Sequence, residues 1–313
     1  MSSRLDTNVR TPKKKKRKWV KVLITALLLL VLAVGAYAFT IYRSLNKAVE
    51  TMHEPINREK SEKRTEDLSL KTAEPFSVLL LGVDQRENDR GRSDSMIVMT
   101  VNQEDVKMIS IPRDTRTEII GRGTQDKINH AYAFGGVEMS MNTVENFLDI
   151  PIDYYVQINM EGFKDIVDAV GGVTVQNTLD FTYSGEHFPE GELMLNGERA
   201  LVYSQMRKQD PRGDFGRQSR QRQIIQGVIK EGASLNTLTN FGDIFSALGN
   251  NVKTNLTFDE MVTIQSKYKA AGKAIEQLEL KGSGTTINDI YYYQVPEEEK
   301  TRVQTVFKDH LAK

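Results

Sequence analysis

The sequence has no cysteine and only four histidines among its 313 residues. Disulfides, thiol nucleophiles and cysteine metal sites are therefore excluded, and a centre built from several histidines is disfavoured. Lysine plus arginine and aspartate plus glutamate each total 42, so the formal net charge is zero. Because a protein that binds nucleic acid without sequence preference usually carries a basic excess, we expect no nucleic-acid partner.

Two motifs of common enzyme classes are missing as well. The sequence has no G-x-x-x-x-G-K-[ST] phosphate loop and no G-x-S-x-G nucleophile elbow. His130, in the stretch KINHAYAFGG, could act as a base, but a single histidine beside a turn of small residues is more often structural.

One long hydrophobic run lies near the N-terminus. Residues 22–42 read VLITALLLLVLAVGAYAFTIY, without a charge, and about 20 apolar residues span a bilayer core as a helix. The basic block RTPKKKKRK precedes the run, and Trp19 and Tyr42 flank it, as the positive-inside rule and the aromatic belts require. The pattern predicts a cytoplasmic tail (residues 1–21), a single-pass type II anchor in the cell membrane (22–42) and an extracellular remainder.

Two other interpretations of this region are open. The tripeptide AYA could be a signal-peptidase site, but the apolar run is longer than the ~7–15-residue core of a signal peptide. The lysine block could be a nuclear-import or nucleic-acid patch, but its position directly before the run favours a topology signal. Residues 43–72, rich in both charges, predict a partly helical extracellular stalk.

Strand and helix patterns alternate through residues 73–313, the predicted extracellular domain. Short apolar runs predict strands at 75–84, 95–102, 106–112 and 153–160. Helical spacing predicts helices at 136–150, 161–172, 195–208 and 215–232. We therefore expect an α/β domain with a central mixed sheet and helices packed on both faces.

Residues 206–223, MRKQDPRGDFGRQSRQRQ, concentrate arginine at the start of a predicted helix. At about 100° per residue, Arg217, Arg220 and Gln221 share a face with the apolar positions of the next two turns, which must face the core. Arg222 projects in another direction and is predicted to face solvent.

A guanidinium group removed from water needs an anion beside it. Asp210 and Asp214, in the same tract, could supply an internal carboxylate network. A ligand phosphate is the other candidate, because the N-terminus of a helix favours an anion. This tract alone does not decide between them.

Carboxylates and further arginines mark neighbouring strand ends. Asp84 closes one predicted strand, Asp94 opens the next, and Arg113 follows a third. Two adjacent carboxylates suit Mg²⁺, which keeps water ligands and bridges phosphates, and open α/β sheets bind ligands at strand ends. These positions favour a metal-bound diphosphate, and a charged, solvated surface is the alternative.

The sequence contains, in order, the stretches LLLGVDQRENDRGRSDSMIVMTVN, ISIPRDTR, KINHAYAFGG, VGGVTV and LNGERALVYSQMRKQDPRGDFGRQSRQRQ. In this order and spacing they resemble the LytR-CpsA-Psr family of Gram-positive bacteria. The match runs from about residue 76 to residue 230 and agrees with the predicted topology. The arginine-rich tract is most similar to the wall-teichoic-acid transferases of bacilli within the family.

The resemblance implies an enzyme that moves an anionic cell-wall polymer from undecaprenyl diphosphate to the C6 hydroxyl of peptidoglycan N-acetylmuramic acid. A phosphodiester forms and undecaprenyl phosphate leaves. A lipid-diphosphate hydrolase and a membrane-bound transcriptional attenuator are the alternatives. The predicted anchor, the zero net charge and the lack of a helix-turn-helix pattern argue against the attenuator, whereas the sequence leaves transferase and hydrolase open.

The resemblance also implies roles for single residues. Asp84 and Asp94 match the ligands of Mg²⁺, for which Mn²⁺ is an alternative, and Asp94 and Arg92 are the predicted catalytic residues. Gln205 stands where many members have an arginine, so one cation of the family's ring is missing and Lys208 or Arg220 could replace it. The predicted diphosphate-binding residues are Arg92, Arg113, Arg207, Arg217, Arg220 and Gln221.

An apolar tunnel for the prenyl chain, between the sheet and the helices, is the last implied feature. Residues of the strand predicted at 153–160 and of the helices predicted at 161–172 and 195–208 could line the tunnel. The same residues are equally suited to a protein core. The predicted lining comprises Val156, Ile158, Phe163, Ile166, Val167, Leu201 and Val202.

Overall fold

The computed structural model describes residues 18–58, 60–84, 91–234 and 248–312. The chain divides into two units, Met1–Ser44 and Leu45–Lys313, and helix α1 (Lys18–Met52) contributes to both. Many large apolar side chains of α1, among them Leu30 and Phe39, are exposed. Within the described ranges, no helix reaches the length and hydropathy expected of a membrane-crossing segment.

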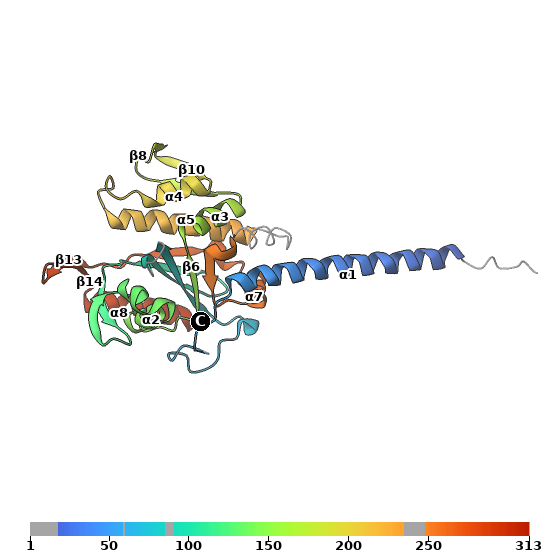
Figure 1. Cartoon of the computed structure of the whole chain (residues 1–313), viewed down its shortest axis with the longest axis horizontal. Coiled ribbons are helices and arrows are strands. Elements are labelled where there is room, and N and C mark those ends of the chain that lie inside the picture. The colour runs from blue at the N-terminus through green and yellow to red at the C-terminus, as the bar shows by residue number, and fades with distance from the viewer. Residues whose placement is uncertain (1–17, 59, 85–90, 235–247, 313) are drawn as a thin grey trace, which may run out of the picture. The chain divides into compact units, whose positions relative to one another are not determined.

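A six-stranded mixed sheet forms the centre of the second unit (Figure 1). The strand order is β11-β6-β1-β2-β3-β12. β1 runs parallel to β6 and antiparallel to β2, and β12 runs parallel to β3, which confirms the predicted mixed sheet. The bounds are β1 Phe76–Asp84, β2 Arg92–Val101, β3 Val106–Ile111, β6 Tyr154–Ile158, β11 Val252–Thr254 and β12 Ile275–Leu278.

Helices cover both faces of this sheet, as the sequence predicts (Figure 1). Side chains alternate along a strand, so β1 supplies Leu79 and Leu81 to one core and Val78 and Leu80 to the other. Burying each such side chain stabilises the fold by about 1.5–3 kcal/mol. The first core lies under α2 (His130–Leu148) and α8 (Glu297–Leu311), and the second under α5 (Asp214–Ser234) and α7 (Phe258–Lys267).

A third core holds together the layer that carries the arginine-rich tract. Phe188 and Tyr203 are fully buried in it and lie against one another with ring centroids 5.4 Å apart. Helices α3 (Met160–Ala169), α4 (Gly197–Gln205) and α5 contribute, together with small strand pairs.

In the described part of the chain, four two-stranded sheets accompany the central sheet. They pair β7 Val173–Asn177 with β10 Gly191–Leu195, β8 Phe181–Tyr183 with β9 Glu186–Phe188, β4 Arg116–Ile119 with β5 Thr124–Lys127, and β13 Ser283–Ile287 with β14 Ile290–Gln294.

Part of the predicted stalk packs on the domain. Arg58 donates to both carboxylate oxygens of Glu145, at 2.7 and 3.1 Å, and Arg64 contacts Asp153 at 2.7 and 2.8 Å. Glu145 and Asp153 are both buried, so removing either arginine would leave an uncompensated buried charge at a cost of about 3–5 kcal/mol. Arg58 and Arg64 therefore bind this end of the segment to the domain. They do not belong to a solvated spacer between the predicted anchor and the domain.

Candidate active site

A β-bulge sets the direction of Asp94. Gly82 pairs with Ser95 and Val83 with Ser93, so Asp94 is an extra residue of β2. Consecutive strand residues normally point to opposite faces, whereas a bulge re-aims the side chain of its extra residue. As a result, Asp94 and Ser95 both line the same cavity.

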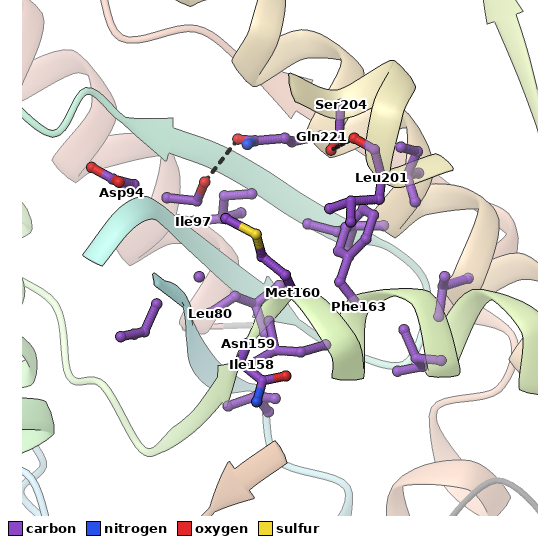
Figure 2. Close-up of a pocket in the computed structure, with 18 of the residues that line it drawn as sticks. Leu80, Asp94, Ile97, Ile158, Asn159, Met160, Phe163, Leu201, Ser204 and Gln221 are labelled. Atoms are coloured by element: carbon purple, nitrogen blue, oxygen red, sulfur yellow. Dashed lines mark hydrogen bonds between the residues drawn. The ribbon is translucent and has the colours of Figure 1, made fainter. Parts of the chain in front are cut away.

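This cavity has a volume of about 370 Å³ and lies between the sheet and helices α3, α4 and α5 (Figure 2). Most of its wall is apolar, with Leu80 and Ile97 on the sheet side and Phe163 and Leu201 on the helix side. Its polar residues include Asp94, Arg217 and Gln221. An extended apolar chain with a polar, anionic head group would match this distribution.

The predicted tunnel lining agrees with the cavity at five of seven positions. Val167 and Val202 pack in the third core instead, because helical residues one position apart differ in direction by about 100°. The five residues that line the cavity are Val156, Ile158, Phe163, Ile166 and Leu201.

Two arginines meet carboxylates at the polar side of the cavity. Arg113 Nη1 donates to Asp94 Oδ1 at 2.6 Å, and Arg217 Nη2 lies 2.8 Å from Asp214 Oδ1. Among the described residues, the buried Nε of Arg217 has no hydrogen-bond partner. A buried donor without an acceptor costs about 1–3 kcal/mol, so this atom is available to an oxygen of a ligand.

The pKa values of these two arginines shift in opposite directions. Burial opposes the charged form of Arg113, but the hydrogen bond and charge of Asp94 raise its pKa above the ordinary value. Burial lowers the pKa of Arg217 despite Asp214 and Asp94, and the positive charges of Arg113 and Arg207 lower it further. An anionic group of a ligand beside Arg217 would therefore stabilise its charged form.

Gln221 is held in place by a serine that sequence reasoning missed. The Ser95 hydroxyl donates to Gln221 Oε1 at 3.0 Å (Figure 2). The carboxamide nitrogen of Gln221 is consequently the group left to donate to a ligand. The signal available in the sequence was the position of Ser95 directly after Asp94.

Arg220, predicted as a diphosphate ligand, is directed at protein acceptors. Its Nη1 donates to Asp210 Oδ2 at 2.6 Å, its Nε donates to the Tyr203 carbonyl at 3.1 Å, and its Nη2 donates to the Met206 carbonyl. Asp210 packs so closely under α5 that a Cβ at Gly216 would fall 1.8 Å from its carboxylate. The internal carboxylate network, one of the two alternatives for the arginine-rich tract, therefore exists and contains Arg220 and Asp210.

The prediction that Arg222 faces solvent is wrong. Arg222 is 5% exposed and donates to Ser110 Oγ at 2.9 Å and to Gln277 Oε1 at 3.2 Å. The reason is that α5 packs into two cores: Ile224 belongs to the third and Ile225 to the second. The prediction from 100° per residue assumed one buried face and one solvent-facing side, whereas α5 is buried on two sides.

The remaining predicted residues, apart from Gln205, are not among those that line the cavity in the described part of the structure. Arg92 begins β2 and Arg207 follows α4, and both are exposed. Asp84 ends β1 opposite Arg92 in the pairing, and its side chain lies outside the described part of the structure. Gln205 lines the cavity, with its amide nitrogen 3.9 Å from Met160 Sδ.

His130 is a structural residue on this geometry. Its Nδ1 lies 2.8 Å from Asp126 Oδ2, and its ring packs edge-on against Phe134. Burial opposes ionisation of Asp126, but the hydrogen bond from His130 lowers the pKa of that carboxyl group below its ordinary value. The histidine is not among the residues that line the cavity.

Comparison with known proteins identifies the family. Residues 39–309 match the model of the LytR_cpsA_psr family. The chain belongs to this family.

Similar proteins agree with that assignment. The chain is 53% identical over 303 residues, 96% of this chain and 98% of the relative, to the polyisoprenyl-teichoic acid–peptidoglycan teichoic acid transferase TagU of Bacillus subtilis (strain 168). It is similar to a structure titled TagT bound to LIIa-WTA, with a TM-score of 0.74, 32% identity and coverage of 83% of this chain and all of that one. An Enterococcus faecalis structure described as a transcriptional regulator has a TM-score of 0.72 and 44% identity, covering 79% and 91%.

Proposed function

We propose that this chain is a transferase that moves a teichoic acid polymer from a polyprenyl diphosphate carrier to peptidoglycan. One observation carries the proposal: an apolar cavity between sheet and helices has Asp94, Arg217 and Gln221 in its wall. The cavity suits the lipid, and the arginines beside it suit the diphosphate. The names of the relatives supply the polymer and the acceptor.

In the proposed reaction a sugar hydroxyl of peptidoglycan attacks the phosphorus that carries the polymer. A new P–O bond forms, the bridging P–O bond breaks, and polyprenyl phosphate leaves along the apolar cavity. Arg217, with Arg113 and Arg207 nearby, would offset the charge that builds on the leaving phosphate. Asp94 would accept the proton of the attacking hydroxyl, and Arg92 would contact the diphosphate from the start of β2.

We propose that Asp94 takes part in holding Mg²⁺, or Mn²⁺ in its place. Its carboxylate is 43% exposed, and the bond to Arg113 uses Oδ1, which leaves Oδ2 for a metal ion. Magnesium is typically held by one or two carboxylates and by substrate phosphates. Asp94 and Asp84 would hold the ion, which when bound polarises a phosphoryl oxygen and stabilises its charge.

An assay that separates the two acceptors tests this function. The full chain in detergent is incubated with lipid-linked polymer, with and without peptidoglycan fragments. We expect polymer joined to the glycan and an equal amount of polyprenyl phosphate released, only when glycan is present. Release without glycan at the same rate would identify a hydrolase, and no release under either condition would contradict the proposal.

We further propose that residues 22–42 anchor the chain in the cell membrane, with the domain outside. The support is the uncharged run itself, the basic block before it and the exposed apolar side chains of α1, such as Leu30. Protease added to intact protoplasts is expected to remove the domain from full-length protein. A protected domain, or a mature protein that starts near Phe39, would contradict the retained anchor.

A further inference from the structure

A second cavity, of about 510 Å³, opens on the other face of the sheet. On β6, Val156 and Ile158 line the first cavity, whereas Tyr155 and Gln157 line the second. Strand residues alternate between faces, so the two cavities lie back to back at the same strand ends. Val83 of β1, one residue before Asp84, borders both.

The stretch KINHAYAFGG, which the proposed reaction does not use, forms one wall of this second cavity. Tyr132, Gly135 and Gly136 line it. Gly136 has φ 65° and ψ −147°, a conformation essentially restricted to glycine, and it breaks the helical path of α2. A Cβ at Gly136 would meet no atom within 4 Å, so its backbone conformation, not crowding, requires the glycine.

The charges of the wall select the kind of ligand. The lining contains two carboxylates, Glu54 and Glu138, and one lysine, Lys253, which donates to the Thr51 carbonyl at 3.2 Å. A net negative wall repels a phosphate-rich polymer. The second cavity is therefore unsuited to the anionic donor and suited to an uncharged ligand.

The neutral groups of the wall suit a sugar. The Tyr132 hydroxyl donates to Gln157 Oε1 at 2.9 Å, which orients the carboxamide so that its NH₂ group can donate elsewhere. Asn57 adds a further amide to the lining, and the amides of Asn159 and Asn251, also in the wall, are fixed by a bond from Asn159 Nδ2 to Asn251 Oδ1 at 3.0 Å. Fixed amides and hydroxyls of this kind match the hydroxyl and acetamido groups of an amino sugar.

We infer that the second cavity binds an uncharged N-acetylhexosamine residue of the acceptor glycan. The inference rests on the proposed function, which it deepens by giving the acceptor a place. Phosphoryl transfer sets the attacking and leaving oxygens roughly in line. A lipid phosphate that leaves along the first cavity therefore requires an acceptor on the opposite side of the phosphorus, and the second cavity lies on the opposite face of the sheet from the first.

The test replaces Gln157 with glutamate in the full chain. Gln157→Glu keeps the oxygen that accepts from Tyr132, but it replaces the donor with a negative charge. We expect the KM for the glycan acceptor to rise about tenfold or more, with kcat at saturating acceptor and the KM for the lipid-linked donor within about twofold. Gln176→Glu, the same change at an exposed position of β7, is the control and is expected to alter none of these values.

A binding measurement separates this inference from the function it rests on. Saturation-transfer NMR with an uncharged N-acetylglucosamine disaccharide, without donor, is expected to show contact with the wild type and its loss in Gln157→Glu. That result supports the cavity even if wild-type transfer fails. A rise in donor KM instead of acceptor KM, or unchanged kinetics and unchanged disaccharide binding in Gln157→Glu, would overturn the inference. Tyr132→Phe, which removes the hydroxyl that orients the amide, is expected to give a smaller rise in acceptor KM.

Discussion

Replacing Asp94 with asparagine is expected to lower the rate of polymer transfer by at least about 100-fold while leaving the fold intact. Asparagine keeps the shape and an oxygen that can accept from Arg113, so the bulge and the hydrogen bond can remain. The change removes the negative charge that would hold the metal and the base that would accept the proton. The carboxylate is 43% exposed, and exposed ion pairs contribute only about 0–1 kcal/mol to stability.

Asp114→Asn is the matched control for that variant. Asp114 also lies beside Arg113, at 3.7 Å, and pairs with Lys127 at 2.7 Å, but it does not line the cavity. Turnover, its dependence on added Mg²⁺ and the melting temperature are measured for both variants. Equal losses of turnover in the two, or a large fall in the melting temperature with metal-independent activity retained in Asp94→Asn, would show that Asp94 only neutralises arginine.

The sequence was sufficient to predict an α/β domain with a mixed sheet covered by helices on both faces, and to predict that Asp94 and Arg113 lie close together. Apolar runs of strand length and helical spacing depend on local periodicity, which a single sequence displays. Charges placed at the ends of consecutive strands come together because the strands do, as Asp94 and Arg113 illustrate. The apolar cavity was predicted only through the family resemblance, since its lining has the composition of any core.

Other features depend on contacts that periodicity does not encode. The bulge at Asp94 arises from the pairing between two strands, and no residue pattern within one strand reveals it. The burial of Arg222 results from the second core that α5 meets, and its partner Gln277 lies 55 positions further along the chain. Arg58 and Arg64 have the composition of a solvated stalk until their partners, Glu145 and Asp153, are brought near by the fold.

Arg217 and Arg220 of α5 could each pair with a ligand phosphate or with an internal carboxylate, and the structure favours a different partner for each. Arg220→Gln is expected to destabilise the protein by about 3–5 kcal/mol. The Asp210 carboxylate, only 1% exposed, would lose its main partner, and the Tyr203 and Met206 carbonyls would lose a donor. Arg212 also contacts Asp210, at 3.4 Å, but it is half exposed and cannot replace a buried bond.

Arg217→Gln, three residues earlier on the same helix, is expected to give the opposite result. Its pair with Asp214 is a helical i,i+3 contact, which contributes about 0.2–0.5 kcal/mol, and the change also removes repulsion from Arg113 and Arg207. Stability without ligand should stay within about 1 kcal/mol of the wild type or rise slightly. Affinity for polyprenyl diphosphate should fall by about 1.5–3 kcal/mol, the range for a charge-assisted hydrogen bond.

Thermal melts without ligand and lipid titrations on the two variants decide the matter. Because the substitutions are chemically identical, any difference between them reflects the surroundings of each guanidinium group. If Arg217→Gln melted as early as Arg220→Gln and bound the lipid as tightly as the wild type, Arg217 would be a structural partner of Asp214, and the proposed transferase would lose its main cationic contact. If Arg220→Gln instead kept its stability and lost lipid affinity, the buried pair with Asp210 would contribute little to folding, and Arg220 would return to the diphosphate-binding set.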